Sequence, residues 1–169
     1  MDQDRTSEAL VQESDMDVLM LDKIVASKVA EAVERVHSDA PYYMMESVAH
    51  NFESPSDAVY WRDDHEGNED TCGYVLLPED YLRLLVFKMS DWERPVHEPL
   101  TVADPRYRRQ HGRVKGLRGT AQRPVCAVAV IPAGRVLEFW SCKSRGATIE
   151  RALYVSKPVV EDDESIMVG

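Results

Sequence analysis

The stretch Leu76–Val96, LLPEDYLRLLVFKMSDWERPV, decides the fold, because its long apolar run is bounded by turn signals on both sides. Pro78 fixes its own φ and disfavours the helical region for the residue before it, so we expect a tight turn over Pro78–Tyr81. Leu82–Phe87 then fits a buried strand. The polar atoms of the stretch lie at its turns, which indicates a structural role and no chemistry.

Length and composition bound the number of domains. With 169 residues, 44% of them hydrophobic, the chain suits one compact domain with two tails. We predict a flexible acidic arm over residues 1–14, a single domain over 15–157 and an extended tail over 158–169. The predicted fold class is α+β, with a long N-terminal amphipathic helix packed with a mainly antiparallel β region and with flexible acidic termini.

Charge is unevenly distributed along the chain, whose net charge is −10. Residues 1–70 carry 18 acidic and 5 basic residues, whereas residues 94–123 carry 8 basic residues and only two acidic ones. Those bases are Arg94, Arg106, Arg108, Arg109, Arg113, Lys115, Arg118 and Arg123. The net charge argues against a free-standing nucleic-acid binder, because Lys and Arg supply most of the affinity for phosphate. The asymmetry favours head-to-tail contact between copies, or contact with another charged partner.

One apolar face predicts a helix from about residue 16 to residue 38. Its members recur at spacings of three and four: Val18, Leu21, Val25, Val29, Ala32 and Val36. Ser14 or Asp15 is a suitable N-cap, and Pro41 ends the pattern. The face packs either on the chain's own domain or on neighbouring subunits, and the sequence leaves both interpretations open.

The remaining segments predict a short helix followed by several strands. Residues 42–50 suit the helix, and a short strand over 58–61 forms a hairpin with Cys72–Leu77.

A helical turn should follow Asp104 and Pro105, and residues 112–120 then read as a flexible basic loop. Residues 123–131 and 135–142 predict an antiparallel hairpin, and 148–155 a third strand. Within that hairpin Glu138 needs a partner or water, either an arginine at an interface or a solvated sheet edge.

No catalytic or metal-binding motif occurs. The five histidines have no ligand spacing, and the acidic run at 63–70 lacks the pattern of a calcium loop. Cys72, Cys126 and Cys142 are expected to be reduced core thiols, in keeping with synthesis in the cytosol. We therefore expect no enzyme, cofactor or metal. The N-terminal residues do not resemble a signal peptide, and no membrane span is expected.

Several segments resemble the head-to-tail connector proteins of short-tailed bacteriophages, in particular the neck ring or tail accessory type of crAss-like and other phages of Bacteroidetes. They are LPEDYLRLLVFKMSDWERPV (77–96), DPRYRRQHG (104–112), LRGTAQRPVCAVAV (117–130), RVLEFWSC (135–142) and ALYVSKP (152–158). The resemblance implies a structural virion protein in the neck that joins the portal to the tail, assembled in the host cytoplasm. It implies a ring, commonly of twelve copies, that contacts other neck or tail rings and through which DNA passes without sequence-specific binding.

Two groups of residues follow as candidates for contacts in such a ring. A closed ring needs two unlike, complementary faces on each subunit. For the subunit interface these are Val18, Leu21, Val25 and Val29 on the helix, with Arg106, Arg108, Arg109 and Arg113 in the basic region. For docking on the portal they are Ile166, Met167 and Val168 in the acidic tail. The alternative is a cytosolic adaptor or regulatory module that binds an acidic partner or nucleic acid through its basic region 94–123.

Overall fold

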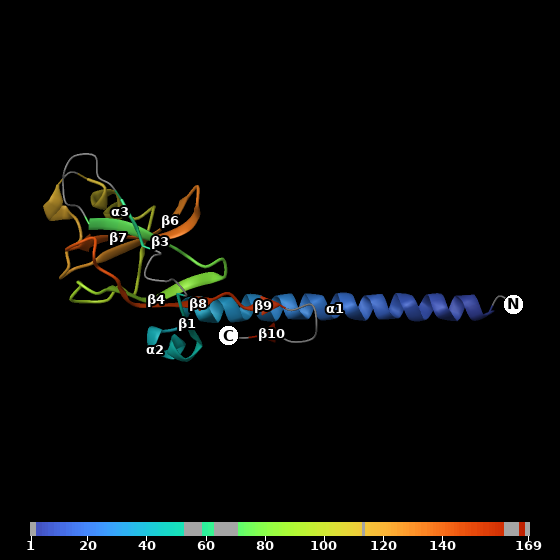
Figure 1. The fold of residues 1–169 in the computed structure, drawn as a ribbon. Coiled ribbons are helices and arrows are strands. Elements are labelled where there is room, and N and C mark those ends of the chain that lie inside the picture. Colours follow the sequence, from blue (N-terminus) through green and yellow to red (C-terminus); the bar gives the residue numbers. More distant parts are fainter. Residues whose placement is uncertain (1–2, 53–58, 63–70, 113, 161–165, 168–169) are drawn as a thin grey trace. The chain divides into compact units, whose positions relative to one another are not determined.

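The computed structural model describes residues 3–52, 59–62, 71–112, 114–160 and 166–167 (Figure 1). The chain divides into two compact units, one formed by Met1–Ala40 with Lys157–Gly169 and the other by Pro41–Ser156. The α+β class is confirmed, because a long helix occurs together with mostly antiparallel sheets.

The first unit is built on the helix α1, Gln3–Asp39. The helix predicted over residues 16–38 is confirmed, but the expected N-cap at Ser14 or Asp15 is wrong, because both lie inside α1. Most of the segment predicted to be an arm is therefore helical. The physical reason is that the sequence has no proline or glycine before residue 41, so nothing in it interrupts the helix.

A short hairpin completes this unit. The strands β9, Val159–Val160, and β10, Ile166–Met167, pair antiparallel, with Ile166 opposite Val160 and Met167 opposite Val159. Strand β9 contacts α1. The tail therefore has more regular structure than the extended segment that the sequence predicted.

The second unit begins with α2, Tyr42–Met45, and a 3-10 turn, Glu46–Val48, where one helix through residue 50 was predicted. Its first sheet has the order β1-β8-β4. These strands are β1, Ala49–Asn51; β8, Ile149–Ser156; and β4, Tyr81–Met89, and all pairs are antiparallel. The third strand predicted after the hairpin, β8, thus joins β4, which is the strand of the opening stretch.

A five-stranded sheet has the order β2-β3-β7-β6-β5. Its strands are β2, Tyr60–Trp61; β3, Thr71–Leu76; β7, Gly134–Cys142; β6, Val125–Ile131; and β5, Leu100–Thr101. Both predicted hairpins, β2–β3 and β6–β7, are confirmed. Only β5 with β6 is parallel among the strand pairs of the described residues. The turn between β6 and β7 ends at Gly134, whose φ of +127° favours glycine.

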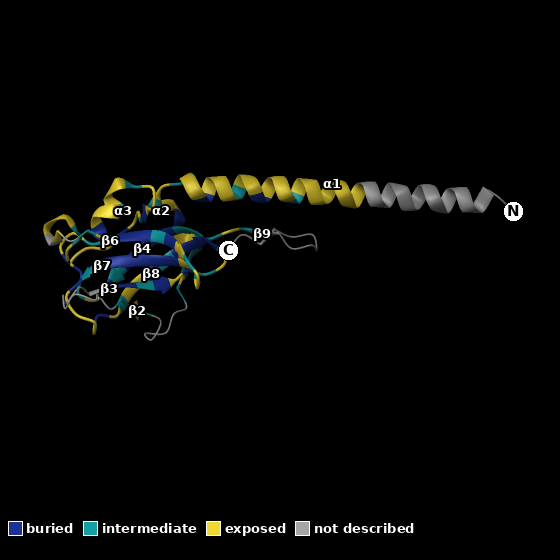
Figure 2. Cartoon of the chain, turned by 90° about the horizontal axis from the view of Figure 1, so that it is seen from above, coloured by how far each residue is buried: buried dark blue, intermediate teal, exposed yellow. Residues whose placement is uncertain are grey.

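The core of this unit lies between the two sheets. Phe87 of β4 and Phe139 of β7 are fully buried, with ring centroids 5.8 Å apart, and Trp92 contacts both rings edge-on. The predicted turn after Pro78 is confirmed by the hydrogen bond that Tyr81 N donates to Pro78 O, at 3.1 Å. Strands β4 and β7 are buried along most of their length (Figure 2). The opening stretch is thus central to the core, as its composition predicted.

The opposite face of the five-stranded sheet carries a second, smaller core. Trp140, Leu100 and Ala127 form it, with Tyr107 packed against them. Tyr107 belongs to α3, Pro105–Gln110, which starts at the N-cap Asp104 as predicted. A 3-10 turn, Lys115–Leu117, follows in the basic region. This second core holds α3 on the sheet and so positions the exposed arginines described below.

Candidate functional site

The apolar face predicted on α1 is exposed to solvent in the chain. Val18, Leu21, Val25 and Val36 each expose more than half of their surface, and Val29 exposes 43%. Figure 2 colours most of the described residues of α1 as exposed. Because burying such a side chain is favourable by about 1.5–3 kcal/mol, a continuous exposed row of them marks an interaction surface. We call Val18, Leu21, Val25, Val29, Ala32 and Val36 the α1 stripe.

A different face of α1 is covered within the chain. Ala30 and His37 are buried, and Ala26 and Val33 are half-buried, at spacings of four, three and four. At 100° per residue, this covered face lies about 100° around the helix from the α1 stripe. The helix thus has two rows of this kind. The covered row ends in His37, whereas the fully apolar row, the α1 stripe, is exposed to solvent.

A groove of about 550 Å³ lies along the α1 stripe. Its described lining is Ile24, Val25, Lys28, Val29, Ala32, Val33, Val36 and His37. Lys28 lies at its edge and is paired with Glu31 on the same helix, with 2.9 Å between Nζ and Oε2. The groove is therefore an apolar trough whose nearest cation already has an anionic neighbour.

The basic residues predicted for a subunit interface lie in the second unit, whereas the α1 stripe lies in the first. Arg106, Arg108 and Arg109 are all exposed on α3. Arg106 forms an ion pair with the N-cap Asp104, at 2.8 Å between Nη2 and Oδ2, and this hydrogen-bonded pair lowers the pKa of Asp104. Arg113 falls outside the described residues. Arg108 and Arg109 form no ion pair with a described acidic side chain, although the charge of Arg109 also contributes to the lowered pKa of Asp104.

A buried carboxylate anchors α3 to the sheet. The Glu138 side chain is only 3% exposed, and it accepts a hydrogen bond of 2.8 Å from the Tyr107 hydroxyl. Arg62, which follows β2, forms an ion pair with the other oxygen of Glu138. His111 Nε2 lies 3.8 Å from Glu138 Oε2. The expected solvated edge at Glu138 is wrong, because β7 is a central strand, and the arginine comes from the same chain and not from an interface.

Burial shifts two pKa values in this cluster. Desolvation, together with the hydrogen bond to Glu138, raises the pKa of Tyr107 to about 12. Desolvation also lowers the pKa of His111, although the charge of Glu138 acts in the opposite direction. Both shifts favour the neutral forms of Tyr107 and His111. The cluster is thus a hydrogen-bonded ion pair flanked by neutral groups, an arrangement that fixes geometry.

The loop over residues 112–120 is held by two side-chain contacts, one to α3 and one within the loop. Gln110, which is buried, accepts a hydrogen bond of 2.8 Å from Gly119 N through its Oε1. Arg118 donates from Nε to Gly112 O, also at 2.8 Å. A Cβ added at Gly119 would lie 2.5 Å from Ser141 Oγ, so this close approach requires glycine. The described part of the loop, which was predicted to be flexible, is thus held at both ends.

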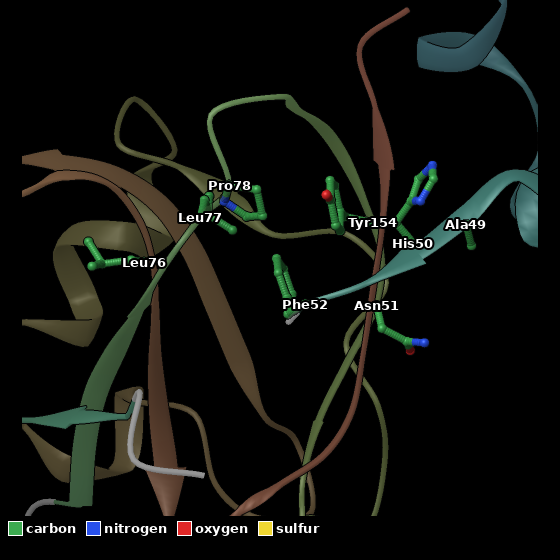
Figure 3. Close-up of a pocket in the computed structure, with 8 residues that line it drawn as sticks. All are labelled: Ala49, His50, Asn51, Phe52, Leu76, Leu77, Pro78 and Tyr154. Carbon is green, nitrogen blue, oxygen red and sulfur yellow. The ribbon is translucent and has the colours of Figure 1, made fainter. Parts of the chain in front are cut away.

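A cleft of about 620 Å³ opens beside β1 in the second unit (Figure 3). Its lining consists of Ala49, His50, Asn51, Phe52, Leu76, Leu77, Pro78 and Tyr154. The rings of Phe52 and Tyr154 stack with centroids 5.4 Å apart. The Tyr154 hydroxyl donates to Asp80, at 3.2 Å from Oδ1. This lining suits an apolar or aromatic group, and its described residues offer no close acid–base pair.

Two other kinds of site are absent from the described residues. No three His, Cys, Asp or Glu side chains there come together as a metal site requires. No helix in the described part of the chain is long and apolar enough to span a membrane. Cys126 and Cys142 are buried, as expected of core thiols, whereas Cys72 is only partly buried.

The portal-docking residues predicted in the tail lie partly in β10. Ile166 and Met167 form that strand, and Val168 lies outside the described residues.

Comparison of the chain with protein-family models, with curated proteins and with solved structures found no match.

Sequence reasoning missed the partners of Glu138. The signal was present, since a carboxylate in an apolar alternating strand required a partner. Arg62 is 76 residues away in sequence, however, and Tyr107 is 31 away. Neither spacing follows a local pattern, so only the folded chain brings these residues together.

Proposed function

We propose that this chain is a non-catalytic structural subunit of a homo-oligomeric assembly, and that the assembly is a neck ring of a short-tailed phage. The observation that carries the oligomer is the exposed α1 stripe, which an isolated soluble chain would leave in contact with water. The phage ring is the assembly to which the resemblance of residues 77–158 points. In that setting the subunit would join portal and tail and surround the passing DNA.

Charge supports this proposal. The acidic residues concentrate in residues 1–70, and exposed arginines gather on α3. A rotationally closed ring places two unlike faces of each subunit in contact, so an acidic and a basic face would attract each other. Since Glu138 and Tyr107 hold α3 in place, the basic face is presented in a fixed orientation. The hairpin β9–β10 is a candidate for contact with the portal.

The test is to measure the mass of the purified protein by mass photometry, alone and with the portal protein encoded by the same genome, and to image the mixture by negative stain. Closed rings or a defined multimer on the portal are expected. A protein that remains at its monomer mass of 19.2 kDa at every concentration and ignores the portal would contradict the proposal.

A second candidate is a module that binds an acidic partner or nucleic acid through α3. It is favoured by the exposure of Arg108 and Arg109, neither of which forms an ion pair with a described acidic side chain. Binding to a DNA duplex with a steep dependence on salt concentration would support this candidate, because phosphate contacts release counterions. Portal-independent binding of that kind, without ring formation, would favour it over the ring.

A further inference from the structure

We infer that the α1 stripe pairs with the same stripe of a second copy, with the two helices antiparallel. This inference rests on the proposed homo-oligomer and names how two copies meet at the α1 stripe. Because the pair has two-fold symmetry, it joins two subunits through the same surface and is not the contact between neighbours within one ring, which the unlike charged faces would make. It is carried by three observations: the spacing of the stripe along α1, the exposure of its side chains and the distribution of charge along the helix.

The stripe is straight along the helix. Residues 18, 21 and 25 recur 11 positions later as 29, 32 and 36, and all six are small or medium apolar residues. A repeat of 11 residues corresponds to 3.67 residues per turn, close to the period of an undistorted helix. The row therefore stays on one side of α1 for about 27 Å, from Val18 to Val36. Such a row can contact another straight helix over its whole length.

The stripe is also nearly symmetric about residue 27. When a second copy of the helix runs in the opposite direction and the two copies cross at residue 27, Val18 lies opposite Val36 and Val25 lies opposite Val29. The two members of each pair are equally far from residue 27. Leu21 then faces Ala32, within one position of the same alignment. In an interface with two-fold symmetry a residue at one end of a surface meets the residue at its other end. The symmetry allows apolar residues of one copy to meet apolar residues of the other along the whole row.

Charge favours the antiparallel over the parallel arrangement. Residues 2–22 contain seven carboxylates and a single base, Arg5. Parallel helices in register would bring this acidic segment against itself, and like charges at short range repel. In the antiparallel pair centred on residue 27, Asp39 lies opposite Asp15, which leaves one like-charged pair at each end. Residues 3–14, with three carboxylates, extend beyond the paired length and are not brought against themselves.

The exposure of the stripe completes the argument. Val25 exposes 55% and Leu21 63% of their surface, although the chain already covers the neighbouring face at Ala30 and His37. The groove along the stripe is lined by apolar residues apart from Lys28 and His37. A second copy of α1 offers the side chains of matching size that would fill this groove.

The first experiment is a pair of matched variants, Val25→Glu on the stripe and Met20→Glu away from it. Both side chains are exposed, at 55% and 68%, so neither variant should unfold the chain. In sedimentation equilibrium the unchanged protein and the Met20→Glu variant should shift from 19.2 kDa towards twice that mass as concentration rises. The Val25→Glu variant should need at least a tenfold higher concentration for the same shift.

The second experiment determines direction by cross-linking in a Cys72→Ser background, where the remaining cysteines are buried. Full-length chains carrying Val18→Cys and Val36→Cys are mixed at a concentration at which the protein is dimeric, and a short bifunctional thiol reagent is added. The antiparallel pair predicts that the mixed cross-link exceeds either self cross-link several-fold. Dominant self cross-links of the Val18→Cys chain would overturn the antiparallel pair, and would leave the proposed oligomer standing.

A protein that stays monomeric at all concentrations would also overturn this inference. The portal experiment then decides the proposed function separately, because rings formed only on the portal would retain the structural role without any α1 pair. Failure of both experiments would reject the pairing and the proposed function together.

Discussion

The Tyr107→Phe variant tests whether Glu138 holds α3 on the sheet. It removes one hydroxyl that donates at 2.8 Å to a carboxylate with a side-chain exposure of 3%. A hydrogen bond to a charged group stabilises a fold by about 1.5–3 kcal/mol. Because Arg62 remains beside Glu138, the larger loss from an uncompensated buried charge should not occur. We expect the free energy of unfolding to fall by about 1.5–3 kcal/mol, or the melting temperature by about 3–12 °C.

The assay is urea unfolding followed by tryptophan fluorescence. All three tryptophans, at positions 61, 92 and 140, lie in the unit that contains Glu138, so the signal reports the unfolding of that unit. The control is Tyr43→Phe, whose side chain is 72% exposed and whose stability should change by less than about 0.5 kcal/mol. The reasoning is refuted if Tyr107→Phe loses no more stability than Tyr43→Phe.

The pH dependence of the same variant gives an independent check. The pKa of Tyr107 rises from 10.0 to about 12 on folding, mainly through burial. A group with a raised pKa in the folded state stabilises fully below the unfolded value, and this contribution disappears as pH rises through the folded value. The stability gap between the unchanged protein and Tyr107→Phe should therefore narrow from pH 10 to pH 12. A gap that stays constant over this range would show that Tyr107 is not protected from ionisation.

Three further outcomes are expected. Phe139→Ala should lower the free energy of unfolding by about 3–5 kcal/mol in urea titrations, because the ring is fully buried between the sheets, and a loss below about 1 kcal/mol would contradict the placement of the core there. The triple variant in which Arg106, Arg108 and Arg109 are each replaced by Glu should form no closed rings in electron micrographs, while its circular dichroism spectrum stays unchanged. Normal rings would contradict the proposal that opposite charges hold neighbouring subunits together. Deleting residues 159–169 should abolish binding to the portal in a pull-down without lowering the stability of the second unit, so retained binding would exclude a docking role for the tail.

Local patterns predicted most of the elements. Pro78 and Gly134 mark turns that are present in the fold, because proline and glycine restrict or permit backbone angles whatever the surroundings. Asp104 before Pro105 likewise predicted the start of α3. The end of α1 was predicted from Pro41, whereas its start was placed too late, since several polar residues before Asp15 were interpreted as an arm and not as a helix.

The sequence by itself determined the long helix, the two hairpins and the buried strand of the opening stretch, because periodicity and turn residues act over a few neighbouring positions. Only the tertiary structure decided which apolar face of α1 is covered, and which residues surround Glu138. Those outcomes depend on pairs such as Arg62 with Glu138, which are distant in the chain and meet only after the strands have taken their order in the sheet. The candidate interface has the same origin: its residues were named from spacing, but their exposure is a property of the folded chain.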